Sequence, residues 1–159
     1  MRNLNVISSF NLGLVQYGIM GTGFSIGGLS CISRGPRDIW HDGTAHGVDL
    51  SNDDALYLDG KRLVLRNGTA MTPGATYSPE DSPFTTVTFV SDNGITGFTL
   101  RTEDGHTMTF GGNENSTFRV PGNDGKGIAY AWNARETTDS NGNATYYKYR
   151  KDGAFFYIS

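Results

Sequence analysis

Short runs of alternating hydrophobic and polar residues, separated by turn dipeptides, dominate the chain. Thr85–Val90 and Ile95–Leu100 flank Asn93-Gly94, and the second run leads through Asp104-Gly105 to Thr107–Phe110. Asn-Gly and Asp-Gly tolerate the positive φ angles of tight hairpins, so they are strong signals for a turn between two strands. The pattern therefore predicts an antiparallel meander of three strands in this part of the chain.

The same pattern occurs on both sides of the meander. Leu56–Leu58 and Arg62–Leu65 flank Asp59-Gly60, while Ile128–Trp132 and Thr145–Arg150 flank Asn141-Gly142. No segment has the period of an amphipathic helix. The predicted fold class is all-β, with antiparallel hairpins and meanders that form a curved sheet in a single domain covering residues 1–159.

Two further segments lie between predicted strands. Met71–Pro83 contains Pro73 and Pro79 and ends on Pro83, and proline disrupts the hydrogen-bond ladder of a sheet, so this segment is predicted to be a loop or an irregular edge. Asp42-Gly43 is a turn dipeptide of the same kind as those in the hairpins.

Composition supports the β assignment and narrows the function. The 159 residues include 22 glycines, 36% are hydrophobic, 12% are aromatic and only 18% are charged. The net charge of −3 argues against nucleic acid as the main partner, because phosphate binding requires clustered Lys and Arg. No apolar run approaches the length of a membrane-spanning helix.

Both ends of the chain have the character of strands. Val6–Phe10 and Phe155–Ile158 are apolar and rich in residues that favour sheets. These ends are expected to be edges cut from a longer sheet, and unprotected edges pair with other chains. The isolated chain is therefore predicted to self-associate.

The residues capable of catalysis or metal binding are few and scattered. Cys31 is the single cysteine, which excludes an intrachain disulfide and a Cys-based zinc site, and its apolar neighbourhood predicts a buried structural thiol. His41 and His46 lie near Asp42 and Asp49, but a strand-and-turn geometry does not place them predictably on one face.

The remaining candidates also have simpler interpretations. His106 is expected to be a surface turn residue like His41 and His46. Asp49–Asp54 could bind calcium, yet it lacks the glycine and distal glutamate of an EF-hand loop, so a solvated loop is favoured. We therefore predict no catalytic, cofactor-binding or metal-binding residue and no enzymatic activity.

Aromatic residues gather in the last part of the chain. They could form a sugar-binding platform or pack across strands, and cross-strand packing is favoured. The residues are Tyr146, Tyr147, Tyr149, Phe155, Phe156 and Tyr157.

Several stretches together resemble one bacterial family. Gly21–Arg34 is similar to a "G-x-G-W-x-L-x-G-L-S-x-I-x-R" stretch, with Phe24 in place of the usual Trp. Asp54–Leu63 resembles "F-x-L-D-G-Q-R-L", Arg101–Gly111 resembles "T-x-D-G-x-x-x-x-Y-G", and Trp132–Tyr149 resembles "D-x-x-G-N-x-x-x-Y-x-Y". In this order they resemble the N-terminal shell region of Rhs/YD-repeat proteins, of the insecticidal toxin complex B subunit and of the plasmid-virulence B protein.

The resemblance implies a structural function. In this family, β-hairpin sheets coil into a hollow cocoon that encloses a toxic C-terminal domain. It implies that the chain is part of a larger shell in a secreted or cell-surface bacterial protein. The implied partners are the remainder of that shell, a C-terminal effector, and a toxin-complex or secretion-system component. A carbohydrate- or receptor-binding β-sandwich and a small β-fold hydrolase remain as alternatives.

Overall fold

The structure is a computed structural model that describes residues 30–121, 127–152 and 155–158. Within these ranges every strand pairing is antiparallel, and the only helix is α2 (Ile39–Asp42), which confirms the all-β prediction. None of the described helices has the length and apolar character to cross a membrane. The strands are β1 (Cys31–Gly35), β2 (Ala55–Leu58), β3 (Lys61–Asn67), β4 (Thr76–Pro79), β5 (Thr86–Asp92), β6 (Ile95–Arg101), β7 (Thr107–Gly111), β8 (Thr117–Val120), β9 (Ile128–Thr138), β10 (Ala144–Tyr146), β11 (Tyr149–Asp152) and β12 (Phe155–Ile158).

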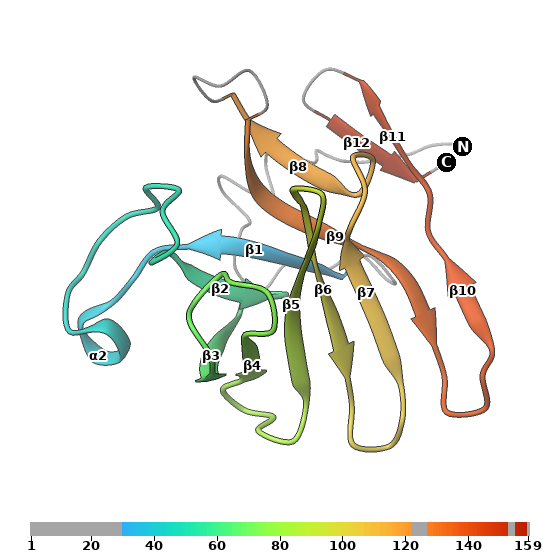
Figure 1. The fold of residues 1–159 in the computed structure, drawn as a ribbon, viewed down its shortest axis with the longest axis horizontal. Helices are drawn as coiled ribbons and strands as arrows, with labels where there is room; N and C mark the ends of the chain where they lie inside the picture. The colour runs from blue at the N-terminus through green and yellow to red at the C-terminus, as the bar shows by residue number, and fades with distance from the viewer. Residues whose placement is uncertain (1–29, 122–126, 153–154, 159) are drawn as a thin grey trace.

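The main sheet closes on itself. Strands β1 to β7 pair in chain order, and β9 follows β7. Because β9 also pairs with β1, with Ile32 opposite Trp132, the eight strands β1–β7 and β9 form a closed barrel (Figure 1). The sequence predicted the curvature of this sheet but not its closure.

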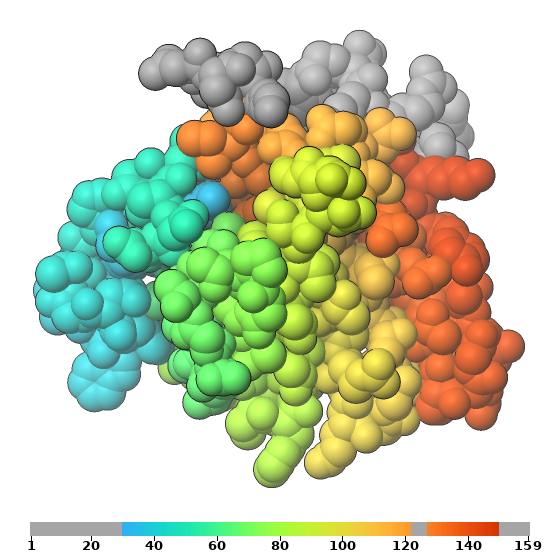
Figure 2. Space-filling model, in the orientation of Figure 1, coloured from blue at the N-terminus to red at the C-terminus, as the bar shows by residue number. Residues whose placement is uncertain are grey.

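Strand β9 is long enough to serve two neighbours on each edge. It has 11 residues, and one edge pairs with β7 and then β8, while the other pairs with β10 and then β1. Strands β8 and β10 consequently extend the sheet outside the barrel ring. The β9–β10 hairpin lies at the outer margin of the molecule (Figure 2), and β11 pairs with β12 in a separate sheet.

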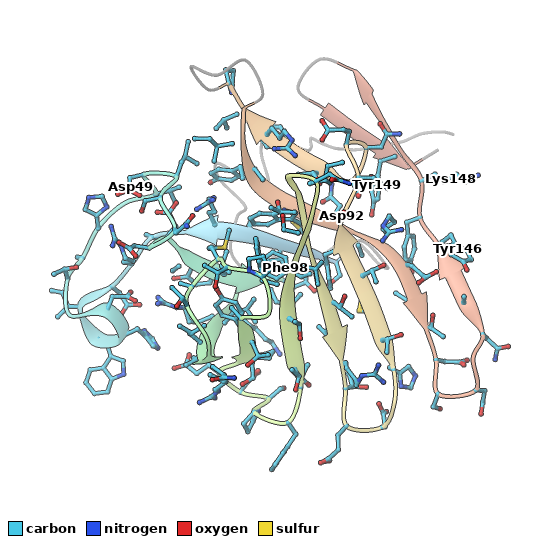
Figure 3. The ribbon with its side chains drawn as sticks, in the orientation of Figure 1. Asp49, Asp92, Phe98, Tyr146, Lys148 and Tyr149 are labelled. Carbon is cyan, nitrogen blue, oxygen red and sulfur yellow. The ribbon has the colours of Figure 1, made fainter. Side chains whose placement is uncertain are left out.

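Aromatic and aliphatic side chains fill the barrel. Phe98 lies in the middle of this core (Figure 3), with its ring centroid 5.0 Å from that of Trp132 and 5.3 Å from that of Phe89. Trp132 is fully buried, and its indole N–H donates a hydrogen bond of 3.0 Å to Thr96. A barrel of this strand number is just wide enough for side chains to fill it. Other core residues are Ile32, Leu56, Leu63, Val87, Leu100 and Phe110.

Gly111 on β7 makes room for the Trp132 ring. Gly97 on β6 lies opposite Gly111 on β7. A Cβ atom on Gly111 would lie 2.4 Å from Cδ1 of Trp132, and the φ angle of Gly111 is +64°, which favours glycine. The largest core side chain therefore fits because the strand beneath it carries no side chain at that point.

The four predicted hairpin turns are confirmed. Asp59-Gly60 joins β2 to β3 with φ angles of 50° and 86°, and Asn93-Gly94 joins β5 to β6 with φ angles of 52° and 81°. Asp104-Gly105 joins β6 to β7, and Asn141-Gly142 joins β9 to β10. The meander between Thr85 and Phe110 is present as β5, β6 and β7.

Two predictions of local structure are wrong. Met71–Pro83 is not simply a loop, because it contains β4, which pairs with β3 and β5 inside the barrel. Pro79 is tolerated as the last residue of this strand, where the missing N–H breaks little of the ladder. Thr145–Arg150 was predicted as one strand, but the chain leaves β10 after Tyr146 and begins β11 at Tyr149.

The turn dipeptide Asp42-Gly43 ends a helix and not a hairpin. The Asp38 side chain caps α2 by accepting a hydrogen bond of 2.8 Å from the His41 N–H. Gly43 then adopts the left-handed conformation with a φ angle of 77°, and its N–H donates to the Ile39 carbonyl. The segment between β1 and β2 thus contains one capped helical turn.

Candidate functional site

His41 connects α2 to the barrel through both ring nitrogens. Nδ1 lies 2.9 Å from the Asp38 carboxylate, and Nε2 lies 2.8 Å from Oε1 of Glu80, which follows β4. The two carboxylates lie on opposite sides of the ring, so they cannot share one metal ion with it. Within the described residues, no group of three His, Cys, Asp or Glu side chains gathers to hold a metal.

Carboxylates accept hydrogen bonds, so this geometry requires an N–H on each ring nitrogen of His41. Only the protonated imidazole has both. Accordingly, hydrogen bonds to Glu80 and then to Asp38 raise the pKa of His41 above its ordinary value.

The second attachment of α2 is ionic. Nη2 of Arg62 on β3 lies 2.6 Å from Oδ1 of Asp42, and Nη1 lies 3.6 Å from the Asp38 carboxylate. Lys61, the next residue on β3, forms an ion pair of 2.8 Å with Asp81. These pairs line a polar pocket of about 320 Å³, in which each charged group already has a partner of opposite charge.

The clamped helical turn presents two apolar side chains to solvent. Trp40 is 89% exposed and Ile39 is 70% exposed, although both are large and hydrophobic. Their backbone is held by the Asp38 cap, the Gly43 terminus and the contacts with Glu80 and Arg62. A rigid, exposed tryptophan is typical of an anchor residue at a protein interface.

The other histidines do not join His41. The His46 ring bonds the Gly47 carbonyl at 2.7 Å and lies 3.7 Å from Asp49, while the His106 ring bonds Asp104 at 2.9 Å. His46 and His106 lie on the surface, as expected. His41 differs from the prediction because it lies in a helix and joins two segments of the chain.

The acidic stretch Asp49–Asp54 is only partly the solvated loop that was predicted. The Asp54 side chain is fully buried and lies 3.2 Å from Nη1 of Arg34, which is itself buried. Both Asp54 oxygens also accept backbone N–H groups, from Asp49 at 3.0 Å and Leu50 at 2.8 Å. Hydrogen bonds from Ser51 lower the pKa of Asp49 to about 2. These carboxylates therefore belong to a structural network of hydrogen bonds and ion pairs, and they do not form an open set of oxygen ligands for calcium.

Arg34 links this loop to the closing strands of the barrel. It projects from β1, and its Nε donates a hydrogen bond of 2.8 Å to the Ala129 carbonyl of β9. Its guanidinium lies 6.0 Å from the ring centroid of Trp132. Burial lowers the pKa of Arg34, and the charge of Asp54 opposes this shift. No sequence pattern predicted this pair, since its members lie in separate motifs.

Cys31 begins β1 and is half-buried, so the thiol is less buried than predicted. Asp59 from the β2–β3 turn accepts a hydrogen bond of 2.8 Å from the Cys31 N–H and another from the Ser30 hydroxyl. Burial raises the pKa of Asp59. The turn that connects β2 to β3 therefore also fixes the start of β1.

The C-terminal tyrosines whose side chains are described do not form one aromatic platform. Tyr149 is buried and donates a hydrogen bond to the Ala134 carbonyl, and Tyr147 packs partly on the core. Tyr146, labelled on β10 in Figure 3, is 66% exposed. Packing is thus observed for Tyr147 and Tyr149, while the side chains of Phe155, Phe156 and Tyr157 lie outside the described part.

A broader acidic groove lies between the β4–β5 and β6–β7 connections. Its volume is about 960 Å³, and it is open to solvent. Phe84, which is 74% exposed, lies in its lining with Asp81, Glu103 and Asp104. Thr102 and His106 also lie in this lining, and both bond the Asp104 carboxylate, with Nδ1 of His106 at 2.9 Å.

We expect the α2 segment to be held less firmly as the pH rises. The raised pKa of His41 means that its contribution is complete below about pH 6.5 and is lost as the pH rises through the higher folded-state value. Hydrogen exchange of the Gly43 amide, corrected for intrinsic pH dependence, should accelerate across this window. His41→Gln should remove the dependence, whereas His46→Gln should leave it unchanged. A profile that is flat in the native protein would contradict the expectation.

Comparison with known proteins identifies the fold. No protein-family model matches the chain, and no curated protein matches it by sequence. In structure it is similar to the N-terminal domain of the effector protein SpvB from Salmonella typhimurium, with a TM-score of 0.62 and 21% identity over 87% of this chain. The chain spans 54% of the length of that solved structure. The all-β fold is therefore shared with a domain of a bacterial effector protein.

Proposed function

We propose that the chain is a structural module of a secreted or cell-surface bacterial virulence protein of the Rhs/YD-repeat type. In this function it is a segment of a larger shell that encloses or presents a C-terminal effector. The observation that carries the proposal is the likeness in fold to the N-terminal domain of an effector protein over 87% of the chain. The order of the family-like motifs in the sequence supports the same conclusion.

The packed interior of the barrel limits where an effector could lie in such a shell. Trp132, Phe98 and Phe110 are almost completely buried inside the ring, so the barrel interior is occupied by its own side chains. An effector would therefore lie against the outer surface of this module or be enclosed together with other parts of the shell. A rigid closed barrel is suited to form one structural unit of the wall of the shell.

A non-catalytic function is part of the proposal. It is supported by the way the described polar side chains are used: Asp54 pairs with Arg34, His41 with two carboxylates, and Asp59 with the start of β1. The partners we propose are the rest of the shell, the effector, and a toxin-complex or secretion-system component.

Recognition of a receptor or carbohydrate is the second candidate function. The observation that favours it is the exposure of Trp40 on a segment that is already ordered. An aromatic anchor that loses little entropy on binding contributes strongly to affinity. Under this alternative, Trp40→Ala abolishes binding to a cell surface or glycan and leaves the protection of an effector intact.

The test compares two substitutions on the same strand of the protein that carries this chain. Val87 is fully buried and Val90 is 41% exposed, and both lie on β5. Val87→Asp places a charge in the core and should disrupt the barrel, which would make the effector segment sensitive to limited proteolysis. Val90→Asp should leave it protected. Protection that persists in Val87→Asp, after loss of the barrel is verified by circular dichroism, would contradict the structural function.

A further inference from the structure

The acidic groove between the β4–β5 and β6–β7 connections, and not the chain ends, is the surface with the clearest chemical character. Phe155–Ile158 pairs with β11, and Val6–Phe10 lies outside the described residues, so self-association of the chain stays a prediction. The two connections that form the groove lie next to each other at one end of the barrel (Figure 1). The groove is open to solvent, so a segment of another protein can enter it.

Hydrogen bonds within each connection hold the two walls of the groove. In the β4–β5 connection, the Ser82 N–H donates to the Pro79 carbonyl and the Thr85 N–H donates to the Ser82 carbonyl, both at 3.0 Å. In the β6–β7 connection, the Thr102 N–H donates to the His106 carbonyl at 2.9 Å. A segment that binds here meets walls that are already ordered, which reduces the entropy lost on binding.

Carboxylate oxygens in the groove retain the capacity to accept hydrogen bonds. Oδ1 of Asp104 accepts from Thr102 and His106 of its own turn, while no described residue donates to Oδ2. The hydrogen bonds from Thr102 and then from His106 lower the pKa of Asp104 to about 2, so this carboxylate is ionised at neutral pH. In the described part of the chain, no group forms a hydrogen bond or an ion pair with the Glu103 carboxylate.

The groove has a deficit of positive charge. Its lining contains the carboxylates of Asp81, Glu103 and Asp104, but it contains no Lys or Arg. Lys61, which forms an ion pair of 2.8 Å with Asp81, is not part of the lining. A cationic partner therefore complements the groove, whereas the phosphates of nucleic acid or of an anionic lipid surface would be repelled.

Phe84 adds an aromatic face to this negative surface. Its side chain is 74% exposed and lines the same groove as Glu103 and Asp104. An arginine guanidinium is planar, stacks on aromatic faces and binds carboxylates through paired N–H groups. A lysine ammonium is a compact, strongly hydrated charge and matches this combination less well. A calcium ion would use the carboxylates alone and would leave the ring without a contact.

We propose that this groove is a docking surface for an arginine-bearing segment of a partner protein. The guanidinium stacks on the Phe84 ring and donates hydrogen bonds to the carboxylates of Glu103 and Asp104. Because these contacts lie near solvent, a short arginine peptide binds weakly, with a dissociation constant of roughly 0.1–10 mM. This binding goes beyond the shell function and does not depend on it.

Titration of the full chain, followed by nuclear magnetic resonance, measures the binding. The probe is a capped peptide of alternating arginine and alanine residues, and a peptide with citrulline in place of arginine keeps its shape without the charge. The arginine peptide should cause saturable shifts of the amide signals of residues 81–85 and 102–106. The citrulline peptide should cause no saturable shift, and a lysine peptide should bind about threefold more weakly or worse.

Two variants and two matched controls locate the contacts. Glu103→Lys should weaken binding about fivefold or more, because it replaces an attraction by a repulsion, and Phe84→Ala should weaken it about threefold. Asp92→Lys makes the same change in net charge at the opposite end of the barrel (Figure 3), and Tyr146→Ala removes an exposed ring from β10. Both controls should bind like the native chain. All four side chains are exposed, so each variant should keep the fold, which its amide spectrum verifies.

Each result decides the matter. Saturable binding that depends on arginine, on Glu103 and on Phe84 supports the proposal. Shifts that do not saturate up to about 20 mM peptide overturn it, as does equal binding of the citrulline or the lysine peptide. An equal loss in Asp92→Lys and Glu103→Lys also overturns it, because the attraction would then come from net charge alone. If calcium chloride saturated the same signals at lower concentration than the peptide, the groove would be a metal site and the proposal would fail.

Discussion

Replacing Trp132 by alanine is expected to lower the free energy of unfolding by about 3–5 kcal/mol. The indole is fully buried and edge-on to Phe98, and its removal leaves a cavity between β9 and Gly111 of β7. Neighbouring side chains can collapse only a little into that cavity, because the barrel wall is a continuous ladder of hydrogen bonds. Loss of the indole also leaves the Thr96 hydroxyl without its hydrogen-bond donor.

The chain contains its own control for this experiment. It has 2 tryptophans, and the other, Trp40, is 89% exposed. Trp40→Ala should change the free energy of unfolding by less than about 0.5 kcal/mol. Urea denaturation of both variants is monitored by circular dichroism, because each variant lacks one tryptophan and the measurement should not depend on tryptophan fluorescence. Similar losses in the two variants would show that Trp132 is not the centre of the core.

Replacing Asp54 by alanine should cost about 3–5 kcal/mol of stability. The substitution leaves the Arg34 charge buried without its carboxylate, and it leaves the N–H groups of Asp49 and Leu50 without an acceptor. Because Arg34 also bonds β9, the effect reaches the seam where β1 closes the barrel. Thermal and urea unfolding should both show the loss.

A neighbouring residue and a double variant separate charge from packing. Asp53→Ala changes an exposed carboxylate next in sequence and should have little effect. Arg34→Met combined with Asp54→Leu removes both charges, so it should be considerably more stable than Asp54→Ala alone. If the double variant were as unstable as the single one, an unpaired buried charge would not be the cause.

The local β structure could be predicted from the sequence because it depends on neighbouring residues. Asn93-Gly94 and Asp59-Gly60 adopt the positive φ angles that tight turns require, and the flanking strands follow directly. Alternation in β5 places Val87 and Phe89 inside and exposes Val90. The family resemblance was based on other stretches as well, of which Asp54–Leu63 contains the Asp59-Gly60 turn, and the fold shared with a bacterial effector domain is consistent with it.

The candidate functional surfaces could be predicted only in part. His41 and Asp54 were identified as residues that could have chemical roles, but their partners were not. Glu80 and Arg34 lie in other segments, and nothing in the local pattern marks them. The exposure of Trp40 was likewise missed, because a tryptophan beside an isoleucine has the sequence character of a buried strand.

The sequence alone determined the antiparallel hairpins and the all-β class, because turn chemistry and strand alternation act over a few residues. Only the tertiary structure decided that β1 pairs with β9, that Asp54 is buried against Arg34, and that β10 remains an edge. These features join residues far apart in the chain, so each depends on the cumulative twist of the intervening strands. Closure is therefore a property of the whole sheet, which no single motif contains.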